Sequence, residues 1–461
     1  MNRWVKALAA VLCAAMTAGV SAGCANKAGD GGAGGVKTVT VWSSASHSKT
    51  VYEAWIKRYN ETEGSDKGIR IDYQVKDSTY SQTLKIALQN GTAPDLFEGG
   101  IAENADNGYV VSLEDIAGGK EFIAPYGDLP YSVKHKGKVY GVPITMQTQG
   151  LVYNKDMFRA AGIVDANGEP TPPKTFDELR EYAKRLTDPK GKKYGIILPL
   201  KWPGWFGSDI GNMLQTSVGH MGFDPTTGKY DYTALAPVMK AYLGMKEDGS
   251  VFPGAEGVDN DPARAQFSMG NVGMKIAFHF DVGVYNDQFP ATCDFGIAPL
   301  PVADLDNAYK QRADVFGSLL INKASVAKLG DAALLEAVRF FTCDETLRHF
   351  YEQGVDLPYK WDIVAGIDLP NAKKGWREFA QMTSLGALYP REPDLASSMG
   401  ANAALDKRFI EEVWNGGSTP EALLADYTRV RNEALEKYLA DHPEDALSNY
   451  LDKDYISKNK R

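Results

Sequence analysis

The stretch TVTVWSSASHSKTVYEAW, residues 38–55, decides the expected fold of this chain. Thr38-Val-Thr-Val-Trp42 has the alternation of a strand, Ser48 follows as an N-cap residue, and residues 51–59 continue with apolar side chains at helical spacing. The pattern then repeats, with a strand at 69–73, a helix at 80–88 and a strand at 94–97. This βαβαβ order predicts an open α/β sheet.

Ligands of open α/β sheets bind in the crevice at the carboxyl ends of the strands. Those ends are Trp42-Ser43-Ser44 and Glu98-Gly99-Gly100. Trp42, Ser44 and His47 end the first strand and open the first helix, whose N-terminus offers free N–H donors. They are therefore candidate ligand-binding residues, although Trp42 would equally suit the core.

The alternation continues along the chain. Thr175-Phe-Asp-Glu178 is a capping box that opens a helix, and residues 196–198 and 274–278 read as buried strands. Asp331 caps a further helix, and Pro420 opens a helical segment that runs to about residue 439.

The composition excludes several classes of protein. The chain has 461 residues, 44% hydrophobic and 24% charged, which is a globular balance and not that of a disordered, collagenous or coiled-coil chain. A net charge of −9 argues against nucleic acid or an anionic membrane surface as the main partner. Aromatic residues reach 11%, with eight Trp and 23 Tyr, so some surface of the molecule is expected to use aromatic rings.

The N-terminal residues have the features of a targeting signal. Residues 1–23 predict a signal peptide, with Arg3 and Lys6 before an apolar stretch that is too short to span a membrane. Ser21-Ala22-Gly23-Cys24 resembles the bacterial lipobox, in which the Cys thiol carries a lipid, although Ser21 departs from the usual aliphatic residue. The alternative is a secretory signal with an incidental Cys. Residues 24–35 would then be a lipidated Cys24 and a Gly-rich tether.

Two further cysteines, Cys293 and Cys343, could form a disulfide or remain buried thiols. No Cys or His spacing typical of a metal site occurs, so neither a metal nor a cofactor is expected.

Several segments of the middle of the chain resemble bacterial extracellular solute-binding proteins of family 1, the maltose-binding-like carbohydrate receptors of ABC importers. The matching segments are Gly137-Lys-Val-Tyr-Gly-Val-Pro143, Gly150-Leu-Val-Tyr-Asn-Lys-Asp-Met-Phe158, Ala161-Gly162 and Pro173-Lys-Thr-Phe-Asp-Glu-Leu179. Weaker matches occur at 93–97, 267–274, 294–301 and 354–358, so the resemblance covers residues 36 to 440.

The resemblance implies an α/β, two-lobed periplasmic-binding-protein fold (type II, carbohydrate cluster) with a hinge and an interlobe cleft. The chain would cross between lobes near Thr145–Gln149, Asp304–Gln311 and Pro358. Residues 36–146 with 312–358 would form the N-terminal lobe, residues 150–304 with 359–440 the C-terminal lobe, and residues 441–461 a tail.

Sugars carry hydroxyls at their rims and C–H patches on their faces, so a binder stacks aromatic rings on the faces and directs polar groups at the rims. Lys201-Trp-Pro-Gly-Trp-Phe-Gly-Ser-Asp209 follows a strand and has neither helical nor strand periodicity. The resemblance places ligand-contacting aromatics in this loop. Trp202 and Trp205 are therefore both candidate ligand-binding residues, and we expect at least one of them to stack on ligand. The alternative is that one of them fills the core.

The remaining candidates follow other strands or crossings. Phe280 and Asp281 follow the 274–278 strand, after His279, which would suit a structural role equally well. The resemblance also points to Glu98 and Gln147 as polar ligand contacts. Trp361, just past the third crossing, and Arg391 are further candidates.

Together these features predict an extracellular lipoprotein that binds an oligosaccharide and delivers it to an ABC permease. It would be a monomer, held on the outer face of the bacterial cell membrane by its lipid alone, with no catalytic residues. A secreted glycoside hydrolase is one alternative, and the number of Asp and Glu residues allows it. No Gly-x-Ser-x-Gly elbow, His-Glu-x-x-His helix or P-loop occurs. A receptor of the same fold for a polyamine or peptide is another.

Overall fold

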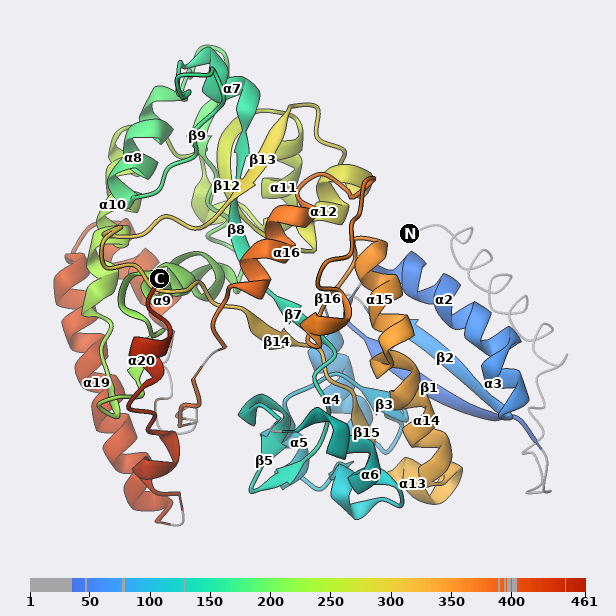
Figure 1. The fold of residues 1–461 in the computed structure, drawn as a ribbon. Helices are drawn as coiled ribbons and strands as arrows, with labels where there is room; N and C mark the ends of the chain where they lie inside the picture. Colours follow the sequence, from blue (N-terminus) through green and yellow to red (C-terminus); the bar gives the residue numbers. More distant parts are fainter. Residues whose placement is uncertain are drawn as a thin grey trace, which may run out of the picture.

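The computed structural model describes residues 35–45, 48–76, 79–127, 129–388, 390–393, 395, 399, 404–443 and 445–461. Figure 1 shows two sheets, each flanked by helices, with a small group of strands between them. The expected α/β architecture is confirmed. The expected signal peptide, Cys24, the tether and His47 lie outside the described residues.

The N-terminal lobe contains a five-stranded sheet of order β2-β1-β3-β15-β4. Strand β1 (Lys37–Ser43) pairs in parallel with β2 (Ile69–Val75) and β3 (Leu96–Phe97). Strand β15 (Leu320–Asn322) is antiparallel to β3 and to β4 (Val110–Val111). Its main helices are α2 (Lys49–Glu61), α4 (Tyr80–Gln89), α5 (Ile101–Asp106), α13 (Lys323–Leu329), α14 (Asp331–Thr342) and α15 (Asp344–Glu352). The predicted βαβαβ start is therefore correct.

The C-terminal lobe contains a four-stranded sheet of order β13-β8-β12-β9. Its strands are β8 (Gln149–Asn154), β9 (Tyr194–Ile196), β12 (Val272–Phe278) and β13 (Phe295–Ala298). The main helices are α7 (Lys155–Ala160), α8 (Phe176–Arg185), α9 (Asn212–Val218), α10 (Ala236–Glu247), α11 (Asn260–Ser268), α16 (Trp376–Ser384) and α19 (Pro420–Asp441). The predicted capping box is present, because Thr175 Oγ1 accepts from the Glu178 amide while Glu178 accepts from the Thr175 amide.

Three short strands lie between the two lobes and form their own antiparallel sheet, of order β14-β7-β16 (Figure 1). They are β7 (Thr145–Gln147), β14 (Asp314–Phe316) and β16 (Leu357–Pro358). Strand β7 leads into β8 of the C-terminal lobe, and β14 leads into β15 of the N-terminal lobe. We call this sheet the hinge sheet.

Each lobe has its own hydrophobic core, and a third apolar cluster joins the hinge sheet to the C-terminal lobe. In that third cluster Met146 of β7 and Leu357 of β16 pack with Trp376 and Phe379 of α16. Each of these side chains is less than 10% exposed, so each contributes on the order of 1.5–3 kcal/mol of burial free energy. This cluster therefore holds the hinge strands against α16 of the C-terminal lobe.

The C-terminal segment packs on the C-terminal lobe. The Tyr455 hydroxyl donates to the Leu388 carbonyl at 2.6 Å, and the Arg461 amide donates to the Ala308 carbonyl at 3.0 Å. Cys293 and Cys343, left open as a possible pair, are free thiols. Among the described helices, none is long and apolar enough to cross a membrane.

Candidate functional site

Polar side chains meet at the carboxyl ends of β1 and β3, as the open-sheet rule predicts. Glu98, directly after β3, accepts hydrogen bonds from the Ser43 hydroxyl at 2.8 Å, the Ser44 hydroxyl at 3.0 Å and the Ser44 amide at 3.2 Å. Ser44 is exposed and Glu98 is half-buried, so the carboxylate is fixed in position yet open to solvent.

A second carboxyl group belongs to the same cluster. The Tyr52 hydroxyl of α2 donates to Asp356 Oδ2 at 2.5 Å, and Asp356 directly precedes hinge strand β16. Tyr52 also stacks on Phe350 at 4.0 Å between ring centroids, which fixes its ring. We call the set of Ser43, Ser44, Tyr52, Glu98 and Asp356 the N-lobe cluster.

The carboxyl groups of the N-lobe cluster influence each other in a partly buried site. Burial raises the pKa of Asp356 to about 6; the Tyr52 hydrogen bond opposes this rise and the charge of Glu98 adds to it. Burial, with the charge of Glu98, also raises the pKa of Tyr80 well above its usual range. The cluster is therefore rich in acceptors and negatively charged at neutral pH.

Aromatic rings gather at the carboxyl end of β12 in the other lobe. Phe278, the last residue of β12, lies parallel to Phe280 with ring centroids 4.8 Å apart, and Trp202 approaches Phe278 edge-on at 6.0 Å. Trp202 and Phe280 are half-buried, so part of each ring is open. We call these three residues the C-lobe cluster.

The hinge sheet links one residue of each cluster. Asp356 directly precedes Leu357, and Leu357 pairs with Met146, the neighbour of Gln147 in strand β7. Two residues after Gln147 in the chain, Gln149 pairs with Phe278 of β12. The carbonyl of Thr148, which lies between Gln147 and Gln149, accepts from the His279 amide at 3.2 Å. A strand rises about 3.3 Å per residue, and paired strands lie about 5 Å apart. The backbones of Asp356 and Phe278 are therefore both close to the short segment 146–149.

This arrangement combines the groups that a sugar requires. The C-lobe cluster offers ring faces and edges, and the N-lobe cluster offers fixed hydrogen-bond acceptors. Among the predicted site residues, Ser44 contacts Glu98 in the N-lobe cluster, Trp202 and Phe280 both lie against Phe278 in the C-lobe cluster, and Gln147 lies in hinge strand β7.

Trp205 is a correction to the sequence prediction. Its side chain is only 1% exposed, and it packs against Phe206 and Phe409 at 5.4 and 5.9 Å between ring centroids. A ring without an exposed face cannot stack on a ligand. Trp205 therefore fills the core of the C-terminal lobe, and Trp202 is the tryptophan of this loop that has exposed ring surface.

Asp281 is a second correction. Its side chain is fully buried, pairs with Arg264 and accepts from the Phe278 amide at 3.2 Å. It therefore orients the strand end and does not face solvent. His279 is fully buried as well, in agreement with the structural role considered for it.

Three other candidates have their contacts within their own neighbourhood. Lys76 Nζ lies 4.2 Å over the Trp42 ring, Trp361 is half-buried with its ring edge-on to Tyr351, and Arg391 covers the Tyr450 ring at 4.7 Å. None of these contacts joins either cluster.

Sequence reasoning missed Tyr52, Phe278 and Asp356. Tyr52 lies in the first turn of the predicted helix, and Asp356 lies two residues before the predicted crossing at Pro358. The sequence thus placed Tyr52 near the start of a helix and Asp356 near a crossing between lobes. Only the fold shows that these two residues contact each other.

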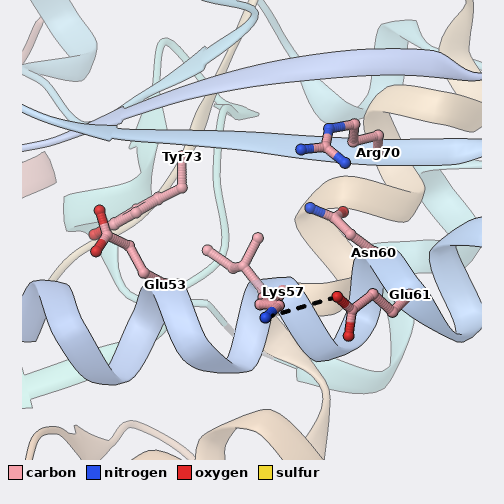
Figure 2. A pocket seen from close by; sticks show the side chains of 7 residues that line it. Glu53, Lys57, Asn60, Glu61, Arg70 and Tyr73 are labelled. Atoms are coloured by element: carbon pink, nitrogen blue, oxygen red, sulfur yellow. Dashed lines mark ion pairs between the residues drawn. The ribbon is translucent and has the colours of Figure 1, made fainter.

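Of two surface hollows on the described chain, the one lined by Tyr73 borders the N-lobe cluster, because Tyr73 stacks on Tyr52 with ring centroids 5.5 Å apart, and the other lies away from both clusters. One lies between α2 and β2, and Figure 2 shows Glu53, Lys57, Asn60 and Glu61 along the helix, with Arg70 and Tyr73 on the strand. The other lies between α8 and α10. Neither is lined by a predicted ligand-binding residue. Within the described ranges, no group of three His, Cys, Asp or Glu side chains could hold a metal ion.

Asp356 predicts a pH dependence of stability. An unfolded Asp ionises near pH 4, whereas burial raises the pKa of Asp356 to about 6. The folded state therefore binds the proton more tightly, and this contribution to stability is present below pH ~4 and lost as pH rises to ~6. A shift of about two pKa units corresponds to about 3 kcal/mol.

The Asp356→Asn variant should therefore gain about 3 kcal/mol of unfolding free energy relative to the wild type as pH rises from about 4 to about 7, by urea titration. Asp362→Asn, at an exposed position, controls for the loss of one carboxyl. A stability difference between Asp356→Asn and wild type that stays constant with pH would contradict the assignment.

Comparison with known proteins places the fold in a family. Residues 42–342, more than half of the chain, match the family described as bacterial extracellular solute-binding protein. A maltotriose-binding protein of Pyrococcus abyssi is 25% identical over 340 residues, which are 70% of this chain and 67% of the relative. An sn-glycerol-3-phosphate-binding periplasmic protein of Escherichia coli is 23% identical over 67% of this chain and 70% of its own length.

Among solved structures, the GacH receptor of Streptomyces glaucescens, studied unliganded and with acarbose, superposes with a TM-score of 0.68 at 19% identity. The match covers 88% of this chain and 99% of the receptor, and so includes both lobes. The two-lobed fold expected from the sequence is thereby confirmed, and the chain belongs to the bacterial extracellular solute-binding protein family.

Proposed function

We propose that this protein binds an oligosaccharide in a cleft between its lobes and delivers it to the permease of an ABC importer. One observation supports the proposal: hinge strand β7 pairs with β16, which directly follows Asp356, and leads into β8, which pairs with the strand that ends at Phe278. A hydrogen-bonding cluster of one lobe and an aromatic cluster of the other are thus both linked to the hinge sheet. Stacking surface on one side and fixed acceptors on the other suit a sugar.

The charge of the N-lobe cluster distinguishes between ligands of the relatives. One relative is named for maltotriose and another for sn-glycerol 3-phosphate. A phosphate dianion would meet Glu98 and Asp356, whose carboxyl groups repel it, whereas sugar hydroxyls donate to them. We therefore favour a sugar without a phosphate group.

Binding would act through hinge closure. A ligand that contacts both lobes has higher affinity for the closed form, and this difference shifts the equilibrium toward closure. The proposed lobes are residues 36–146 with 312–358 and residues 150–304 with 359–440, and surfaces of both would dock on the permease. We also propose a monomer, anchored outside the cell through Cys24.

Calorimetric titration tests the proposed function. The panel is maltotriose, other neutral oligosaccharides, sn-glycerol 3-phosphate, a polyamine and a peptide. We expect binding of at least one oligosaccharide and no binding of the phosphate ester. The proposal fails if no sugar binds while the phosphate ester, polyamine or peptide does.

A binding protein leaves its ligand chemically unchanged. We therefore expect a bound oligosaccharide to be recovered intact after prolonged incubation, as measured by chromatography of the released sugar. Glu98 and Asp356 serve as acceptors in this account, not as the acid and nucleophile of a glycosidase. Turnover that disappears in Glu98→Gln would instead favour the hydrolase alternative.

A further inference from the structure

The N-lobe cluster carries negative charge that no described cation neutralises by an ion pair. Glu98 is held by neutral donors, the hydroxyls of Ser43 and Ser44 and the Ser44 amide. Asp356 is held by the Tyr52 hydroxyl. Neutral donors fix the geometry of a carboxylate but leave its full charge in place.

Basic side chains close to these elements have other partners. Lys76, which follows β2, lies over the Trp42 ring and donates to Gln74 Oε1 at 3.0 Å. Arg312, next to hinge strand β14, pairs with Asp314. Lys76 and Arg312 are thus committed to other partners, and neither forms an ion pair with Glu98 or Asp356.

Two carboxyl groups without a counterion are costly in a partly buried site, and an opposite charge within about 4–6 Å would offset that cost. The raised pKa of Asp356 agrees with negative surroundings, since its causes are burial and the charge of Glu98. A ligand cation at Glu98 would supply the missing positive charge.

We propose that the site prefers an oligosaccharide bearing an ammonium group, as in a 2-amino-2-deoxy sugar, over a neutral sugar with the same backbone. The ammonium would donate to Glu98, with Asp356 adding to the field, while a sugar ring lies against Trp202 and Phe280. This inference rests on the proposed function, because it concerns the same interlobe site.

A matched pair of ligands tests the preference. The β-1,4-linked glucosamine trimer and the N-acetylglucosamine trimer share one backbone, but only the first carries ammonium groups. By calorimetry near pH 6, we expect the charged trimer to bind at least tenfold more tightly at about 0.02 M salt. Because salt screens partly exposed charges, the ratio should shrink at about 0.5 M.

Two variants complete the test. Glu98→Gln should bring the affinity ratio of the two trimers close to one. Glu61→Gln removes one charge on α2, at the hollow of Figure 2, and should leave the ratio unchanged. The inference is overturned if the acetylated trimer binds as tightly as the charged one, or if the preference persists in Glu98→Gln. If neutral oligosaccharides bind without a charge preference, the proposed function survives alone; if no sugar binds, both fail.

Discussion

Replacing Trp205 by alanine is expected to lower the free energy of unfolding by about 3–5 kcal/mol. The indole is 1% exposed and packs between Phe206 and Phe409 in the core of the C-terminal lobe. Its removal forfeits burial of a large apolar surface and leaves a cavity that the surrounding rings fill only in part. Urea-induced unfolding, followed by circular dichroism, measures this loss.

Trp202→Ala in the same loop is the matched control for stability. Because Trp202 is half-buried, its truncation should cost less than half as much as that of Trp205. Equal losses for the two variants would show that the loop does not divide its tryptophans between core and surface.

The second large effect concerns binding, for which Trp202 is expected to matter more than Trp205. Trp202→Ala should weaken oligosaccharide binding by at least tenfold, or about 1.4 kcal/mol or more, because a half-exposed ring beside Phe278 loses its stacking surface. Trp202→Phe should recover part of the affinity, because a smaller ring keeps a stacking face.

Calorimetric titration of folded Trp202→Ala with the oligosaccharide measures this loss of affinity directly. A Trp205 variant that keeps the core filled, Trp205→Phe, should retain affinity within a few-fold. An unchanged affinity in Trp202→Ala would remove the C-lobe cluster from the site.

The elements that carry local signals were predictable from sequence. The βαβαβ start, the Thr175 capping box and the Pro420 helix each depend on residues close in the chain, and the structure contains all three. The position of Glu98 was predictable too, because strand ends of an open sheet share one edge.

What could not be predicted depends on packing between distant segments. Trp202 and Trp205 lie three residues apart in one Pro/Gly loop, and only the turn of the chain after Trp202 decides which enters the core. Asp281 has a polar side chain just after a strand, yet this side chain is buried and forms an ion pair with Arg264 of α11. Tyr52 and Asp356 are separated by 304 residues, so no local pattern reports their contact.

The central claim is that one sugar contacts both lobes beside the hinge. A crystal structure of the protein with a bound oligosaccharide tests it most directly. We expect a sugar ring against Trp202 or Phe280 and a hydroxyl or amine within hydrogen-bond distance of Glu98. A ligand bound in the hollow between α2 and β2, or one that touches a single lobe, would contradict it.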